Sequence, residues 1–165
     1  IQEYKETLYK LLYELDKYDI DIYKRIKSLY SKKDWLAERK NIIDRVSKEK
    51  NSYWYVNDLL KIYIEEKMYD DIYNIIKDKD MDTIISYEQY LLPKYNKELL
   101  NIYVKYCYSF ANKASDRKMY SELARKILHI KQMKNSKNEY TKLLEGLQEK
   151  YRKKTAMQDE LSKIL

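Results

Sequence analysis

Glycine and proline are almost missing from this chain, which has one of each in 165 residues. Both residues disrupt regular helices, and both are normally common in turns. Their scarcity predicts an all-α protein whose helices are joined by short polar loops. The apolar residues favour the same class, because no stretch alternates with the period of two that is typical of a half-buried strand.

Cysteine and histidine are equally scarce, with Cys107 and His129 as the single examples. One thiol excludes an intramolecular disulfide and favours a reducing, cytoplasmic setting over secretion. The pair also falls short of the four nitrogen and sulfur ligands of a structural zinc site. We therefore expect no metal and no other cofactor. We expect Cys107 to be buried and unreactive, and His129 to be a partly buried or surface residue near a helix end.

Long apolar runs and glycine-rich loops are absent as well. The sequence contains no run of 18 apolar residues, so no membrane span is predicted, and no signal peptide is visible. A single glycine cannot build a phosphate-binding loop. Neighbouring carboxylates lack the Glu-x-x-His pattern of helical di-iron sites, and we interpret them as solvated faces. These pairs are Asp19 and Asp21, Glu65 and Glu66, Asp70 and Asp71, and Asp159 and Glu160. We expect no enzyme activity.

Apolar residues recur at helical spacing along almost the whole chain. Ten such stripes follow one another, and the sixth is predicted to end near Pro93 because proline interrupts a helix. They begin at Tyr4, Ile22, Trp35, Val56, Tyr69, Met81, Leu99, Tyr120, Tyr140 and Met157. Short loops favour antiparallel neighbours. We therefore predict about ten helices in an irregular antiparallel hairpin array, forming a single all-helical domain over residues 1–165.

A weak repeat supports the array. Trp35, Tyr69 and Tyr103 are spaced at the 34-residue period of tetratricopeptide repeats. The small residues of that repeat are largely missing, so the likeness is one of style, and a compact bundle with accidental spacing is the alternative. Because Ile1 lies in the middle of a helical pattern, we expect the chain to be a C-terminal fragment of a longer protein.

Two helix starts carry a capping-box pattern, in which a hydroxyl residue and the side chain three positions later satisfy each other's backbone donors. Ser136 precedes Glu139 in this way, and Thr155 precedes Gln158. The second pattern lies in the segment EKYRKKTAMQDEL at 149–161, where a basic run meets two acids. Such an order of charges suits the end of one helix and the start of the next.

Gly146 lies inside the ninth predicted helix, where glycine costs about 1 kcal/mol relative to alanine. We expect close approach of a neighbouring helix to offset this cost, and sequence drift is the alternative. The flanking residues Leu143 and Leu147, with Tyr120 and Ile127 of the eighth predicted helix, are predicted to form a shared core.

Positive charge is concentrated in the C-terminal half. The net charge of +7 divides into −2 for residues 1–90, with 17 basic and 19 acidic residues, and +9 for residues 91–165, with 17 and 8. A one-sided positive field favours acidic partners, either nucleic acid or an acidic protein surface. The candidate polyanion-binding residues are Arg117, Lys118, Arg125, Lys150, Arg152, Lys153 and Lys154. An ordinary solvated face is the alternative.

Three stretches of the C-terminal half resemble a known family. They are LPKY at 92–95 leading into ELL at 98–100, ASDRKMY at 114–120, and EKYRKKTAMQDEL at 149–161. Together they resemble the C-terminal helical region of bacterial SWIM zinc-finger proteins over roughly residues 90–165, and residues 18–21 do so more loosely. The pattern differs where Lys154-Thr155 replaces an Arg-Pro. The Cys-x-Cys and Cys-x-His zinc ligands are absent, so zinc binding does not carry over.

This resemblance implies a bacterial cytoplasmic protein with a zinc finger upstream, in a family associated with DNA or protein binding. Combined with the composition, it leads us to expect a non-enzymatic helical interaction module that docks a protein partner or another domain of its parent chain. An accessory nucleic-acid-binding module that uses residues 91–165 is the alternative.

Overall fold

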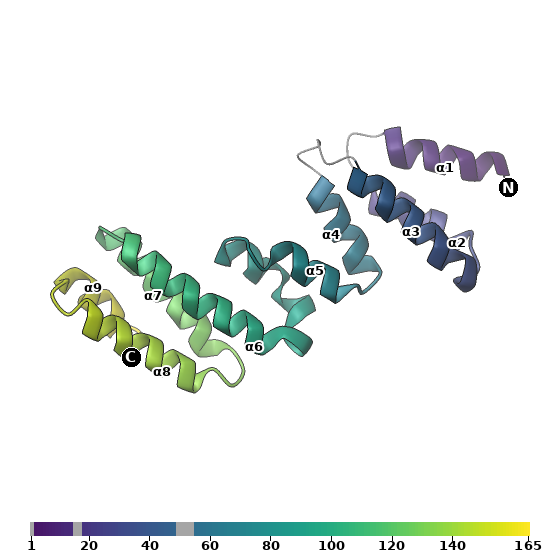
Figure 1. The fold of residues 1–165 in the computed structure, drawn as a ribbon. Helices are drawn as coiled ribbons and strands as arrows, with labels where there is room; N and C mark the ends of the chain where they lie inside the picture. Colours follow the sequence, from purple (N-terminus) through teal and green to yellow (C-terminus); the bar gives the residue numbers. More distant parts are fainter. Residues whose placement is uncertain (1, 15–17, 49–54) are drawn as a thin grey trace. The chain divides into compact units, whose positions relative to one another are not determined.

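The computed structural model describes residues 2–14, 18–48 and 55–165, and every regular element in these ranges is an α-helix (Figure 1). The all-α prediction is confirmed for this part of the chain. Ile1, where the sequence predicts an interrupted helix, lies outside it. None of the described helices is long and apolar enough to cross a membrane.

The chain divides into two compact units, Ile1–Ile75 and Ile76–Leu165. The single-domain organisation and the tetratricopeptide-like style stay predictions. The helices of the first unit are α1 (Gln2–Glu14), α2 (Ile20–Ser28), α3 (Lys32–Lys48), α4 (Tyr55–Glu65) and α5 (Tyr69–Ile76), the last of which ends at the boundary. Those of the second are α6 (Met81–Lys113), α7 (Arg117–Gln132), α8 (Lys137–Lys150) and α9 (Thr155–Ser162).

In the first unit α1 packs against α2, and α3 packs against α4. The buried side chains include Leu8, Leu12, Tyr23, Ile26, Trp35, Ile42, Val46, Leu60 and Ile62. Trp35 lies edge-on to Tyr23, with ring centroids 5.3 Å apart. Tyr4 and Leu11, which continue the predicted apolar stripe of α1, are exposed.

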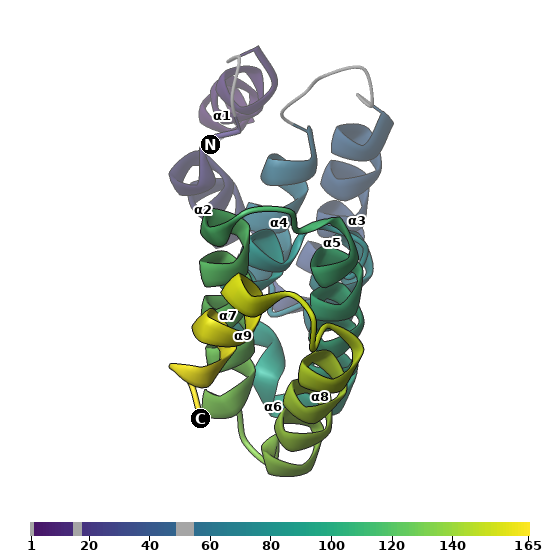
Figure 2. The same cartoon turned by 90° about the vertical axis from the view of Figure 1, so that its left-hand side faces the viewer.

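In the second unit α7 contacts α6, α8 and α9 (Figure 2). Its buried residues recur every three or four positions, as an amphipathic helix requires. They are Tyr120, Leu123, Ala124, Lys126, Ile127 and Ile130. Leu143 and Leu147 of α8 are also buried, so the core predicted from Tyr120, Ile127, Leu143 and Leu147 is confirmed.

Helix α6 runs for 33 residues and passes through Pro93, where the sequence predicts a helix end. The prediction is confirmed in part, because two helical segments meet at a kink beside Pro93, but they join without a loop and count as one element. Proline removes one backbone donor and crowds the preceding turn. The backbone of Tyr95 leaves helical geometry at φ −111° and ψ 17°. The bend therefore replaces the predicted loop, which leaves nine helices among the described residues instead of ten.

The two predicted capping boxes are wrong in detail. Ser136 does precede α8, but its hydroxyl donates to the Met133 carbonyl at 2.8 Å. Its backbone has helical angles instead of the extended ones that let a cap side chain reach forward. Thr155 is the first residue of α9, Lys154 stands at the cap position, and neither side chain caps the helix. Asp116 is a true cap, since its carboxylate accepts from the Met119 amide of α7 at 2.8 Å.

Turns that often use glycine are made here by other residues. Lys67 follows α4 in the left-handed region with φ 56°. The Lys67 amide donates to Ile64 and the Met68 amide donates to Tyr63, at 3.1 and 2.8 Å. This is the Schellman pattern of helix ends, with lysine at the position that glycine usually holds. Asn135, after α7, has φ 59°. Because glycine is scarce, Lys67 and Asn135 adopt left-handed backbone angles that are less favourable for residues with a side chain.

The one glycine lies where α8 packs against α6. A Cβ atom added at Gly146 would lie 2.5 Å from the hydroxyl oxygen of Tyr108, which is closer than real Cβ contacts allow. A neighbouring helix does fill the space beside Gly146, as predicted in general terms, but with the end of the Tyr108 side chain and not with its backbone.

Candidate binding pocket in the C-terminal unit

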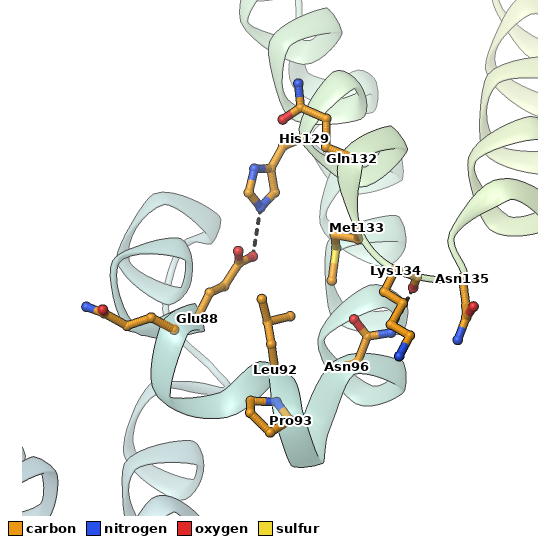
Figure 3. Close-up of a pocket in the computed structure, with 10 residues that line it drawn as sticks. Glu88, Leu92, Pro93, Asn96, His129, Gln132, Met133, Lys134 and Asn135 are labelled. Carbon is orange, nitrogen blue, oxygen red and sulfur yellow. Dashed lines mark hydrogen bonds and ion pairs between the residues drawn. The ribbon is translucent and has the colours of Figure 1, made fainter.

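The kink of α6 and the C-terminal end of α7 enclose a pocket of about 600 Å³ in the second unit (Figure 3). It exists because the chain bends at Pro93 and because α7 ends at Gln132, after which Met133 turns away in an extended conformation. Residues of α6 that line it are Glu88, Gln89, Leu92, Pro93 and Asn96. The other lining residues are His129, Gln132, Met133, Lys134 and Asn135.

A buried carboxylate lies at one side of this pocket. Glu88 Oε1 accepts a hydrogen bond from the Tyr103 hydroxyl at 2.5 Å and lies 2.7 Å from His129 Nε2. The Glu88 side chain is 11% exposed and the His129 side chain 26%. Burial raises the pKa of Tyr103, and the hydrogen bond to the Glu88 carboxylate raises it further, so the hydroxyl stays a donor.

The rest of the lining is apolar at its base and polar at its rim. Met133 is buried and Leu92 is half-buried, while Gln89 and Gln132 are exposed. The Asn96 amide donates to the Lys134 carbonyl at 2.9 Å, which joins α6 to the segment after α7. The pocket thus combines apolar surface, amide groups and a buried carboxylate in contact with a histidine, the combination typical of ligand and peptide sites.

Of the residues in this pocket, the sequence pointed to Leu92 and Pro93 for other reasons, and it pointed to His129 for its chemistry. Its predicted placement, partly buried near a helix end, is confirmed, but its partner was missed. Glu88 lies 41 residues earlier, and no local pattern connects the two. Cys107 is buried as predicted, and burial raises the pKa of its thiol to about 12.

The seven candidate polyanion-binding residues fall into three groups. Arg117 forms ion pairs with Asp159 and Glu160 at 3.1 and 3.0 Å. Arg125 pairs with Asp82 at 3.0 Å. In these two cases a neighbouring carboxylate already balances the positive charge, which reduces what the arginine can offer to a phosphate.

Lys150 and Lys154 have structural contacts. Lys150 donates to the Asn112 side chain and Lys154 to the Ala114 carbonyl, at 3.0 and 3.1 Å. The Lys154 ammonium also lies 5.7 Å from the ring centre of Tyr120. These contacts hold the turn between α8 and α9 against the C-terminal end of α6.

Lys118, Arg152 and Lys153 form the third group. All three are exposed, and none of their side chains has a hydrogen bond or an ion pair with another described residue. They are the members of the predicted set that are best placed to contact a phosphate, and Arg152 and Lys153 lie on the turn that Lys154 fixes in place.

Two of the predicted solvated carboxylates are in fact buried. The Glu66 side chain is 5% exposed and lies within reach of Lys27, Trp35 and Arg39, at 2.9 to 3.3 Å. The Tyr23 hydroxyl also donates to it at 3.1 Å. Burial by itself would raise the pKa of Glu66, but the hydrogen bonds, with Lys27 foremost, bring the pKa below its usual value.

Glu160 is the second buried carboxylate, with 6% of its side chain exposed between Arg117 and Lys163. The hydrogen bond from Lys163 is the main reason that its pKa lies below the usual value.

Among the described residues, no cluster of three or more His, Cys, Asp and Glu side chains has the arrangement of a metal site.

Comparison of the chain with protein-family models, with curated proteins and with solved structures gives no match. The resemblance to the C-terminal region of SWIM zinc-finger proteins therefore stays a prediction, and any function assigned to the chain rests on the site itself.

Proposed function

We propose that this chain is a non-enzymatic, cytoplasmic helical interaction module that holds a segment of a protein partner, or of another part of its parent chain. The pocket between α6 and α7 is the contact point. A single observation carries the proposal: a preformed concavity of about 600 Å³ with the buried Glu88 carboxylate held by His129 inside and unengaged amide side chains at its rim.

The physical properties of the pocket fit a short peptide segment. Its volume lies within the range of about 300–1,000 Å³ that is usual for ligand sites. Leu92 and Met133 give an apolar base and the exposed Pro93 adds apolar surface, while Gln89 and Gln132 offer both donors and acceptors at the rim. Because the pocket is built mainly from two helices, little conformational entropy is lost when it is filled.

A peptide selection tests this proposal. Random twelve-residue peptides displayed on phage would be selected on the wild-type chain and then measured on two variants. Leu92→Glu places a charge in the pocket, and Leu128→Glu places the same charge on an exposed position of α7 outside it. We expect the selected peptides to bind Leu92→Glu at least about tenfold more weakly than the wild type, a loss of about 1.4 kcal/mol in binding free energy. They should bind Leu128→Glu with the affinity of the wild type.

Circular dichroism melts of both variants show whether each is folded. If no peptide is enriched on the wild type, or if enriched peptides bind a folded Leu92→Glu as tightly as the wild type, the pocket is not a docking site and the proposal is wrong.

A specific observation favours a second function, the binding of nucleic acid. Lys118, Arg152 and Lys153 are exposed cations whose side chains have no partner among the described residues, in the half of the sequence with a net charge of +9. Each phosphate contact contributes about 0.9 to the slope of log affinity against log salt for duplex DNA. Replacing all three by glutamine should lower that slope by up to about 2.7. Absence of measurable binding at low salt would eliminate this alternative.

A further inference from the structure

We propose that the pocket between α6 and α7 takes the guanidinium group of an arginine that the bound segment carries. This inference rests on the proposed function and gives the chemistry of its ligand. Charge complementarity with Glu88 is the main argument, and the shape and polarity of the lining supply the others.

Glu88 supplies the negative charge. It is the one acidic residue among the described residues that line the pocket. Tyr103 and His129 both approach Oε1. No described group donates to Oε2. Glu88 Oε2 is also not among the buried side-chain atoms that lack a partner, so it is open to a ligand or to solvent. A carboxylate with one oxygen engaged and one open is fixed in place from behind and can accept a hydrogen bond from a ligand in front.

His129 holds Glu88 from the side of α7. When Nε2 carries a proton it donates to Glu88 Oε1, which leaves Oε2 for a ligand. Figure 3 shows the ring facing Glu88 from α7. Amide oxygens of Gln89 and Gln132 add further acceptors at the rim. The site therefore favours a ligand with several donors that diverge in one plane.

Lys134 is a positive charge near the pocket, and its position decides how strongly it repels a bound cation. It is exposed at the rim, whereas Glu88 is buried. Two unit charges 4 Å apart interact by about 1 kcal/mol in water and by about 4 kcal/mol at the effective dielectric of a protein site. A cation inside the pocket is therefore attracted by Glu88 more than it is repelled by Lys134.

Arginine fits this lining better than lysine does. The guanidinium group is planar, has five donors and is more weakly hydrated than an ammonium group. Leu92, Pro93 and Met133 offer apolar surface for the methylene stem and for the face of the guanidinium. An ammonium group would lose more hydration on entry and could not meet diverging acceptors in one plane.

Nuclear magnetic resonance titration of the full chain tests the inference. The probes are Nα-acetylarginine methylamide and its citrulline analogue, which is uncharged and has nearly the same shape. We expect the arginine probe to shift backbone amides of residues lining the pocket in a saturable way, with an affinity at least about tenfold higher than that of the citrulline probe. Glu88→Gln should weaken arginine binding by about tenfold or more, and Glu145→Gln, an exposed change on α8, should leave it unaltered.

Equal binding of the citrulline probe, or unchanged arginine binding to a folded Glu88→Gln, would overturn the inference. Should Glu88→Gln fail to fold, Gln132→Lys provides the second test, because it adds a competing cation at the rim. It should weaken the arginine probe by about tenfold, while Gln148→Lys on α8 should have no effect, and equal binding to both would again contradict the idea.

The peptide selection separates this inference from the proposed function. Peptides that bind the pocket without a common arginine would refute the inference and leave the docking function intact. A selection that enriches no peptide at all would refute the docking function itself.

Discussion

Replacing Gly146 by alanine should stabilise the chain in one background and not in another that differs from it by one oxygen atom. In the wild type the new Cβ atom would lie 2.5 Å from the Tyr108 hydroxyl oxygen, while the next ring atom is 3.6 Å away. The variant Tyr108→Phe removes that oxygen and keeps the ring. In this background the methyl group introduced by Gly146→Ala would make an ordinary van der Waals contact.

Two opposing effects set the magnitude. Alanine is better than glycine in a helix interior by about 1 kcal/mol. Forcing an extra methyl group into a packed contact usually costs about 1–3 kcal/mol. Tyr108 is half-buried, so its ring can shift, which places the cost at the lower end of that range. Gly146→Ala should therefore be neutral or destabilising by up to about 2 kcal/mol in the wild type, and stabilising by about 1 kcal/mol in the Tyr108→Phe background.

Urea unfolding of the four proteins, followed by circular dichroism, gives the interaction energy between the two positions as a double-mutant cycle. We expect at least about 1 kcal/mol. Equal stabilisation by Gly146→Ala in both backgrounds would show that Tyr108 does not occupy the space beside Gly146, and that the contact between α6 and α8 is looser than described.

Leu147 is fully buried, so Leu147→Ala should lower the free energy of unfolding by about 2–5 kcal/mol in urea titrations, and a change under about 0.5 kcal/mol would place it at the surface. The pKa of Glu66 is lowered in the folded chain, so its contribution is complete above the usual carboxyl pKa of about 4.3 and is lost as the pH falls through the folded value. Stability measured from pH 6 down to pH 3 should therefore fall less steeply in Glu66→Gln than in the wild type, and parallel curves would contradict this. Replacing Lys118, Arg152 and Lys153 together by glutamine should alter the unfolding free energy by less than about 0.5 kcal/mol, because no described residue pairs with their side chains, and clear destabilisation would mean that they are part of the fold.

The helical architecture was predictable because it depends on information that is local in the sequence. In α7 the residues Tyr120, Leu123, Ile127 and Ile130 recur at helical spacing, and all four are buried. The burial of a residue inside such a pattern requires no knowledge of its partner. The exposed Tyr4 and Leu11 of α1 mark the limit of the method, because periodicity alone does not show which face of a short helix will be covered.

Helix ends were predicted less well, for a different reason. The residue pattern at Ser136 matches a capping box, but the turn that leads into α8 gives Ser136 helical backbone angles, and its hydroxyl reaches backward. At Pro93 the missing donor could either end the helix or bend it. The helix bends here, and a single sequence does not show which of the two outcomes occurs.

The pocket was hidden from sequence reasoning because its parts meet through tertiary structure. Glu88, Tyr103 and His129 lie on two helices and come together only after α6 bends and α7 folds back beside it. The basic residues were found, since charge is a composition property. The partners of these residues were not found. Arg117 and Arg125 are exposed but already form ion pairs, which makes them weaker candidates for binding a phosphate.

Cys107 is fully buried in the second unit, and burial raises the pKa of its thiol to about 12. Its rate of labelling can therefore report how often this unit opens. Disulfide reagents react with the exposed thiolate, so the native chain should be labelled only during transient openings that bring Cys107 into water. Because the chain has no other thiol, every labelling event reports on the same position. The ratio of this rate to that of the unfolded chain measures the opening equilibrium around α6, and the same reagent can be used on each variant without adding a probe.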